Sequence, residues 1–146
     1  MQLSTKGRYA VMAMADLAGH AVERAVPLAE IAKRQELSLS YLEQLFARLR
    51  RRGLVKSVRG PGGGYRLARP ADHTTVADVV VAVDEPLRAT RCAEHDPLKG
   101  CMRGGARCMT HALWEETGRQ IISYLSSVTL ADVVAGRLRP ESKAAA

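Results

Sequence analysis

The stretch that most constrains the fold runs from Cys92 to His111. It contains all three cysteines of the chain, Cys92, Cys101 and Cys108, and His111 follows the last of them after two residues. The stretch offers almost nothing apolar to bury, so packing cannot give it a fixed shape. Thiolates and an imidazole that converge on a metal would hold it instead, because ligation supplies folding energy that the local sequence lacks. We therefore expect a metal-binding loop that acts as a sensor for the part of the chain before it.

Basic residues are concentrated in the first half of the chain. Residues 1–70 hold 13 Lys and Arg against 5 Asp and Glu, whereas residues 71–146 hold 9 against 10. This surplus favours a polyanion such as DNA as the partner of the first half, with a merely solvated basic surface as the alternative. No apolar run is long enough to span a bilayer, and the N-terminus lacks the core of a signal peptide. We expect a cytoplasmic protein with no membrane partner and with reduced thiols.

Three helices are predicted before residue 53. Ser4 or Thr5 can cap the first, and Pro27 suits the start of a short second helix. The third begins near Ser38 or Ser40, where Ser40 and Glu43 have the spacing of a capping box. Its apolar residues recur on one side and its polar and basic residues on the other: Leu42, Leu45, Phe46 and Leu49 inward; Tyr41, Gln44, Arg48 and Arg51 outward. Two short helices, a tight turn and such a third helix predict a helix-turn-helix.

A β-hairpin is predicted directly after this helix, beyond Gly53, which is placed to end the helix in a left-handed conformation. Residues 54–58 and 65–67 are strand-like, and the Arg-Gly-Pro-Gly-Gly-Gly run at 59–64 cannot be helical. Arg59 at the tip of such a wing suits a phosphate or a narrow minor groove. A nucleotide-binding loop is a weaker alternative, because no Gly-Lys-Ser/Thr follows. A helix over residues 76–83, with a buried strand as the alternative, completes a winged helix-turn-helix domain over residues 1–83.

The second half is predicted to hold a metal-binding loop (84–108), a dimerisation helix with a short final helix (109–136) and a disordered tail (137–146). The long helix, residues 109–127, carries a wide apolar band: Trp114, Ile121 and Val128 recur every seven residues, and Leu113, Thr117, Tyr124 and Leu125 widen it. This band is too apolar for a lone surface helix, which favours a homodimer. Packing of the helix on its own domain is the alternative.

The ligand spacing, Cys-x8-Cys-x6-Cys-x2-His, leaves two metal centres about equally compatible with the chain. A 2Fe–2S cluster takes four ligands, and imidazole can replace thiolate there. Zinc accepts the same four ligands, or the pairs Cys92/His95 and Cys108/His111 with Cys101 idle. A thiol redox sensor is a third hypothesis. An enzyme with Cys108 as nucleophile and His111 as base is a fourth, but no orienting group accompanies them, so we expect no enzyme.

Several blocks of the sequence resemble the iron–sulfur cluster regulators (the IscR family), which lie within a larger set of winged-helix bacterial repressors. The blocks are residues 3–9 (LSTKGRY), 37–49 (LSLSYLEQLFARL), 53–65 (GLVKSVRGPGGGY), 83–92 (VDEPLRATRC) and 108–114 (CMTHALW), and the match spans about residues 1–136. The resemblance implies a homodimeric transcription regulator, mainly α with a small β wing. It also implies a 2Fe–2S cluster held by Cys92, Cys101, Cys108 and His111.

The resemblance also implies which residues contact DNA: Ser38, Ser40, Tyr41, Glu43 and Gln44 in the third helix, and Arg59 and Gly60 in the wing. It implies that the form without a cluster recognises a wider set of operators than the loaded form, with cluster-assembly genes as targets. We also expect cluster-assembly scaffold proteins as partners. The cysteine spacings are longer here than in the best-known members of the family, so His95 stays an alternative fourth ligand.

Overall fold

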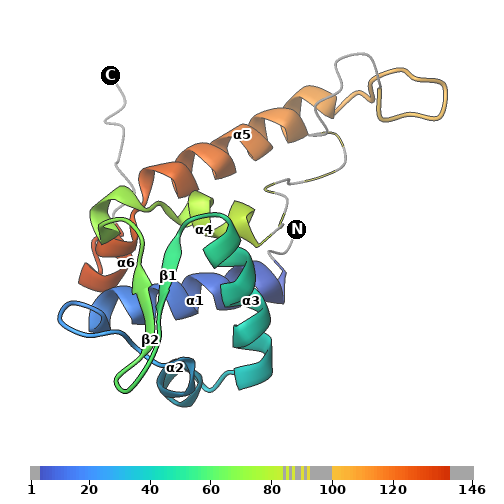
Figure 1. Cartoon of the computed structure of the whole chain (residues 1–146). Helices are drawn as coiled ribbons and strands as arrows, with labels where there is room; N and C mark the ends of the chain where they lie inside the picture. Colours follow the sequence, from blue (N-terminus) through green and yellow to red (C-terminus); the bar gives the residue numbers. More distant parts are fainter. Residues whose placement is uncertain are drawn as a thin grey trace.

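The computed structural model describes residues 4–83, 85, 87, 90, 92 and 100–138. In chain order the elements are helices α1 (Thr5–His20), α2 (Leu28–Gln35) and α3 (Leu39–Arg51), strands β1 (Val55–Val58) and β2 (Gly64–Leu67), the 3-10 turn η1 (Ala71–His73), and helices α4 (Val76–Ala82), α5 (His111–Ser127) and α6 (Leu130–Ala135). In Figure 1 α5 lies across the packed elements, and its first turns reach away from them. The predicted mainly α fold with a β-hairpin wing is confirmed.

One hydrophobic core joins α1, α2 and α3 to α4 and α6. Because the apolar side chains of α3 recur every three or four residues, one face of that helix is buried. The largest side chains of this core are fully buried: Met14 and Leu17 from α1, Ile31 from α2, Leu42, Leu45, Phe46 and Leu49 from α3, Val79 from α4, Val83 just after it, and Leu130 from α6. The inward face predicted for α3 is therefore confirmed.

The helices α4 and α6 begin with the same N-terminal capping motif. Thr75 and Asp78 form a capping box at α4, and Thr129 and Asp132 form one at α6. The segments before the two helices are paired, because the Val76 amide donates to the Val128 carbonyl oxygen at 2.9 Å. The helix predicted after residue 75 is confirmed over the alternative of a buried strand.

The start of α3 differs from the predicted capping box. Ser38 is the N-cap, and its Oγ accepts a hydrogen bond from the Tyr41 amide at 3.3 Å. The prediction that Ser40 caps together with Glu43 is wrong, because the helix begins at Leu39 and Ser40 already lies inside it. Glu43 is exposed, and its carboxylate faces solvent rather than closing the helix.

The hairpin is fixed to the rest of the domain through Tyr65 of β2. β1 and β2 are antiparallel, with Val55 opposite Leu67 and Val58 opposite Gly64. The segment before α2 joins β2 through two backbone hydrogen bonds of 2.9 Å between Val26 and Tyr65. The Tyr65 ring meets Phe46 edge-on, with 5.0 Å between ring centroids. The wing therefore has a defined position relative to α3.

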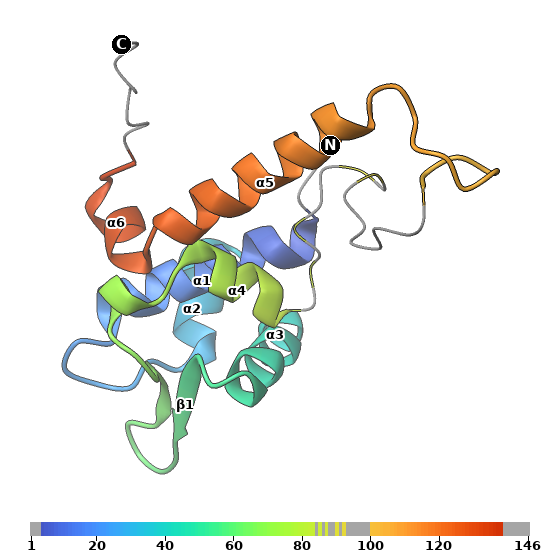
Figure 2. The ribbon, with the colours of Figure 1, turned by 90° about the horizontal axis from the view of Figure 1, so that it is seen from above.

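Among the described residues, the hydrophobic core covers helix α5 near its C-terminal end. Near its C-terminus, Leu125 and the following Val128 pack against Val76 and Val80 of α4. Toward its N-terminus it extends beyond the core, as Figure 2 shows. Large apolar side chains stay exposed along it, Leu113 at 57% and Tyr124 at 49%. Of the predicted apolar band, Val128 is buried and Leu125 half-buried against the domain, whereas Leu113 and Tyr124 stay exposed.

Within the described part of the chain, no helix is long and apolar enough to cross a membrane. Most of the predicted tail and part of the predicted loop, including His95, lie outside the described residues.

Candidate metal centre and nucleic-acid interface

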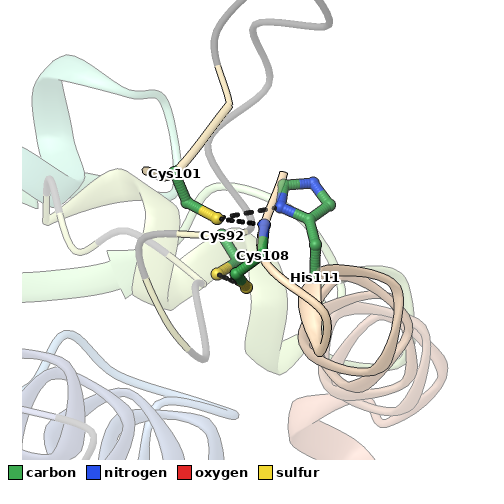
Figure 3. A group of neighbouring side chains, drawn as sticks. All are labelled: Cys92, Cys101, Cys108 and His111. Atoms are coloured by element: carbon green, nitrogen blue, oxygen red, sulfur yellow. Dashed lines mark hydrogen bonds between the residues drawn. The ribbon is translucent and has the colours of Figure 1, made fainter. Parts of the chain in front are cut away.

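The three cysteines and His111 come together at the N-terminal end of α5 (Figure 3). Their ligand atoms all lie within 4.8 Å of one another. The Sγ atoms of Cys92 and Cys108 are 3.8 Å apart, and Cys101 Sγ lies 3.4 Å from His111 Nδ1. The four residues predicted as metal ligands therefore form one group in the structure.

Backbone hydrogen bonds shape the part of the loop that carries the later ligands. The Gly100 amide donates to the Gly105 carbonyl oxygen at 3.1 Å, and the Met102 amide to that of Ala106 at 3.1 Å. Gly105 has a φ of 80°, which an L side chain rarely adopts, so the turn depends on glycine there. The expectation that ligation alone shapes the loop is incomplete, since this tight turn already positions Cys101 near Cys108.

The start of α5 brings the last ligand into the group. The His111 amide donates to the Cys108 carbonyl oxygen at 3.0 Å, and the Cys108 amide donates to Cys101 Sγ at 3.2 Å. Amide hydrogen bonds to thiolate sulfur are common around metal centres, where they stabilise the negative charge. Cys101, Cys108 and His111 thus come from one short stretch, and Cys92 joins them from nine residues before Cys101.

Burial and hydrogen bonding affect the thiols differently. Cys92 and His111 are each only 8% exposed, whereas Cys101 and Cys108 are half-buried. Burial, together with hydrogen bonds to the other two sulfurs, raises the pKa of the Cys92 thiol. Hydrogen bonds from Cys101 and then from Thr110 lower the pKa of the Cys108 thiol. Metals bind thiolates, so the lowered pKa of Cys108 favours ligation there, whereas the raised pKa of Cys92 opposes it.

The donor set fits both metal centres that the sequence left open. A 2Fe–2S cluster has two irons that share four protein ligands, and three sulfurs and one imidazole nitrogen, all within 4.8 Å of one another, supply that number. Tetrahedral zinc with Zn–S bonds of about 2.3 Å separates its sulfur ligands by roughly 3.8 Å. Soft thiolates with one imidazole suit either centre and do not suit magnesium or calcium.

Most residues predicted to contact DNA are exposed. Ser38, Ser40, Glu43 and Gln44 are exposed in the first two turns of α3, and Arg59 and Gly60 are exposed at the tip of the wing. Tyr41 differs, because it is half-buried and its ring meets Tyr9 of α1 edge-on at a centroid distance of 6.1 Å. Further basic side chains are exposed nearby, namely Arg50, Arg51, Arg52 and Lys56.

Leu39 is a candidate contact that the sequence reasoning missed. It is 43% exposed at the first residue of α3, beside Ser38 and Ser40. Its helical spacing from Leu42 would place it on the buried face, and only its position at the end of the helix could have indicated otherwise. An exposed apolar side chain there can contact the methyl group of a thymine in the major groove.

Comparisons with known proteins agree with this architecture. Residues 3–136 match the Rrf2 family, described as an iron-dependent transcriptional regulator. The HTH-type transcriptional regulators IscR of Photorhabdus laumondii and Xenorhabdus nematophila are 56% and 57% identical over 134 residues, which cover 92% of this chain and 79% of each relative. The solved structure of T. potens IscR is 40% identical with a TM-score of 0.75, and the match covers 100% of this chain and 93% of that one. CymR, the global cysteine regulator of B. subtilis, is 33% identical with a TM-score of 0.77, over 93% and 98% of the two chains.

These relatives are regulators of transcription and not enzymes, which confirms the expectation of a DNA-binding regulator without catalytic activity. The resemblance inferred from the sequence blocks is confirmed as well. The chain belongs to the Rrf2 family of iron-dependent transcriptional regulators and, within that family, to the IscR regulators.

Proposed function

We propose that this protein binds operator DNA as a homodimer, and that Cys92, Cys101, Cys108 and His111 hold a 2Fe–2S cluster whose presence alters the choice of operators. The observation that carries the proposal is the convergence of four donor atoms within 4.8 Å in a regulator whose first half is a winged helix-turn-helix. A bound cluster supplies an iron- and redox-responsive centre. The regulated genes are those for cluster assembly, in the cytoplasm, and cluster-assembly scaffold proteins are further partners.

The exposed side of α3 supports sequence-specific recognition of the operator. Glu43 is the informative residue there, because phosphates repel a carboxylate while the N4 amino group of cytosine can donate to it. Such a group favours some operators and penalises others. Arg59 at the wing tip contributes differently, through phosphate or minor-groove contacts that carry little base information.

Contacts at the start of the loop connect the metal centre to the DNA-binding domain. Arg48 of α3 donates to the Val83 carbonyl oxygen at 3.5 Å, and the Ser4 hydroxyl at the start of α1 donates to the carboxylate of Glu85. A little further on, Leu87 packs against the small core between α4 and α5. A movement of Cys92 on ligation is transmitted through these anchors to α1 and α3. By linkage, DNA changes the affinity for the cluster by the same factor.

The open part of α5 supports the homodimer. Exposed apolar side chains recur along it, Leu113, Trp114, Ile122 and Tyr124. A second copy of the same helix offers a complementary surface, as in many symmetric regulators that read two half-sites. Light scattering on the purified protein tests this point, and the mass expected is twice the 15.9 kDa of one chain.

The main test uses protein purified without oxygen. Its visible absorption, iron, sulfide and zinc contents are measured, and the affinities of loaded and stripped protein for a panel of operators are compared at one salt concentration. The proposal expects equal iron and sulfide, two of each per chain, and a change of operator preference on stripping. Indistinguishable affinities of both forms for every operator contradict the regulatory part.

A structural zinc ion is the second candidate, and one specific observation favours it. The 3.8 Å between the Sγ atoms of Cys92 and Cys108, and the compactness of the whole donor group, also suit four ligands around a single ion. Zinc in place of iron and sulfide in the fresh protein would identify this case, and its removal would then unfold the loop without changing operator preference.

A further inference from the structure

Thr110 occupies the N-cap of α5 without capping the helix. The other two threonines at N-caps, Thr75 and Thr129, each accept a hydrogen bond from the amide three residues later, both at 3.1 Å. Thr110 makes no side-chain bond of this kind, and its backbone has φ −99° and ψ 11° rather than the extended values of the other two. Its hydroxyl is therefore available for a different role.

The hydroxyl of Thr110 lies between Trp114 and Cys108. Trp114 Nε1 donates to Thr110 Oγ1 at 3.1 Å, and Thr110 Oγ1 lies 3.7 Å from Cys108 Sγ. The indole N–H can only donate, so Thr110 must accept on that side. The single hydrogen of the hydroxyl then remains for the sulfur, which accepts it. A ligated thiolate carries no hydrogen, so in the loaded site the hydrogen bond runs from the Thr110 hydroxyl to Cys108 Sγ.

We propose that Thr110, oriented by Trp114, is a positioning residue that donates a hydrogen bond to the sulfur of Cys108 and thereby raises the reduction potential of the metal centre. The inference rests on the 2Fe–2S cluster of the proposed function. A donor aimed at a ligand sulfur stabilises negative charge there, and the reduced cluster carries one more electron than the oxidised one. The reduced state is therefore stabilised more than the oxidised state.

The positions of Thr110 and Trp114 allow them to adjust the reduction potential of the metal centre without a role in the core. Cys108 is half-buried, so water competes with Thr110 for its sulfur less than at a fully exposed thiolate. Trp114 lies one helical turn after Thr110 on α5 and is itself 37% exposed, so its indole is held by the helix and not by the core. Both residues can therefore be changed without removing a core side chain.

The test compares Thr110→Val with Thr110→Ser in the full-length protein, loaded without oxygen with ferrous iron and sulfide. Valine keeps the shape of threonine and lacks the donor, whereas serine keeps the donor. The midpoint potential is measured by redox titration of the visible absorption. At the wild-type midpoint we expect Thr110→Val to be oxidised and reduced in a ratio of about ten to one, a fall of roughly 59 mV for one electron. Thr110→Ser should titrate like the wild type.

Trp114→Phe provides a second variant with Thr110 intact. Without the indole donor the hydroxyl can turn away from the sulfur, so the potential should fall part of the way toward that of Thr110→Val. If Thr110→Val does not retain a cluster, the potential of Trp114→Phe alone tests whether the Thr110 hydroxyl raises the reduction potential. A wild-type potential in Trp114→Phe and in any loaded Thr110→Val protein, or an equal fall in Thr110→Ser, overturns the inference.

The two proposals fail in different ways. If the wild-type protein shows zinc and no iron–sulfur absorption, the proposed cluster is wrong and this inference falls with it. If the wild type holds the cluster and the variants titrate with it, only the role of Thr110 is wrong.

Discussion

Replacing Arg34 with methionine is expected to destabilise the helix-turn-helix by about 3 kcal/mol, because it leaves the buried Asp16 without its main partner. The side chain of Asp16 on α1 is only 1% exposed. Arg34 on α2 donates to both of its carboxylate oxygens, from Nη2 at 2.7 Å and from Nε at 3.0 and 3.2 Å. Gln35 Nε2 also donates to Oδ2 of Asp16, at 2.8 Å. These bonds join the first two helices, and α2 in turn supports α3.

The magnitude follows from what the substitution leaves behind. Breaking a buried ion pair by removing one partner typically costs about 3–5 kcal/mol, because the other charge stays buried. Two features place the expected cost of Arg34→Met at the lower end of this range. The Arg34 side chain is 31% exposed, and Gln35 continues to donate to Asp16. Methionine retains most of the aliphatic volume of arginine, so lost packing contributes little.

The cost of the substitution should depend on pH in a defined direction. Burial would raise the pKa of Asp16, but hydrogen bonds from Arg34 and Gln35 and the charge of Arg34 outweigh it and lower the pKa below its ordinary 3.8. The stability that this carboxylate contributes in the wild type is therefore present above the unfolded pKa and lost as pH falls through the lower folded value. In Arg34→Met burial dominates and raises the pKa, so protonation relieves the penalty. The difference in unfolding free energy between the two proteins should shrink as pH falls from 7 toward 4.

Urea unfolding followed by far-ultraviolet circular dichroism measures the effect, at one protein concentration because association contributes to the stability of a dimer. Arg24→Met is the matched control, since Arg24 pairs with Glu30 at 2.7 Å where both side chains are exposed. It should cost much less, as exposed ion pairs generally do. Equal costs for the two variants, or a difference that grows toward acid pH, would refute the reasoning.

Three further outcomes are expected. Cys92→Ala should lose the cluster absorption and remain a folded dimer that binds DNA, as seen by circular dichroism and light scattering; an unfolded product would mean that the metal is structural. Arg59→Ala should weaken binding to all operators by the same factor and reduce the slope of log affinity against log salt by about 1; altered preference at a single base would contradict this. Ser4→Ala, which removes no helix cap, should narrow the difference in affinity between loaded and stripped protein; an unchanged difference argues against this anchor.

The parts of the fold that depend on local sequence were predictable. The spacing of Leu42, Leu45, Phe46 and Leu49 indicated the buried face of α3, and the glycine run 59–64 indicated the turn of the hairpin. The N-cap of α3 was less predictable, because serines at positions 38 and 40 offer the same chemistry. Which of them caps depends on where α2 ends. The helix ends at Gln35, and Glu36 follows it in a left-handed conformation that only the folded chain specifies.

The chemistry of the candidate site was predictable, and its arrangement was not. Three cysteines and a histidine in an apolar-poor segment indicated metal ligands. The half-buried position of Tyr41 depends on Tyr9, which lies 32 residues earlier in the chain, so no local pattern indicates it. Likewise, no local pattern indicates the direction of the Thr110 hydroxyl, which accepts a hydrogen bond from Trp114 across one turn of α5.

Insertions are tolerated unequally in the two parts of the ligand loop, before and after Cys101. A residue inserted between Cys101 and Cys108 would disrupt the hydrogen-bonded turn that positions both. The entropy of loop closure sets a weaker limit on the spacing between Cys92 and Cys101, because each doubling of loop length costs only about 0.6 kcal/mol. Natural variants of this regulator should therefore differ in length before Cys101 more often than after it.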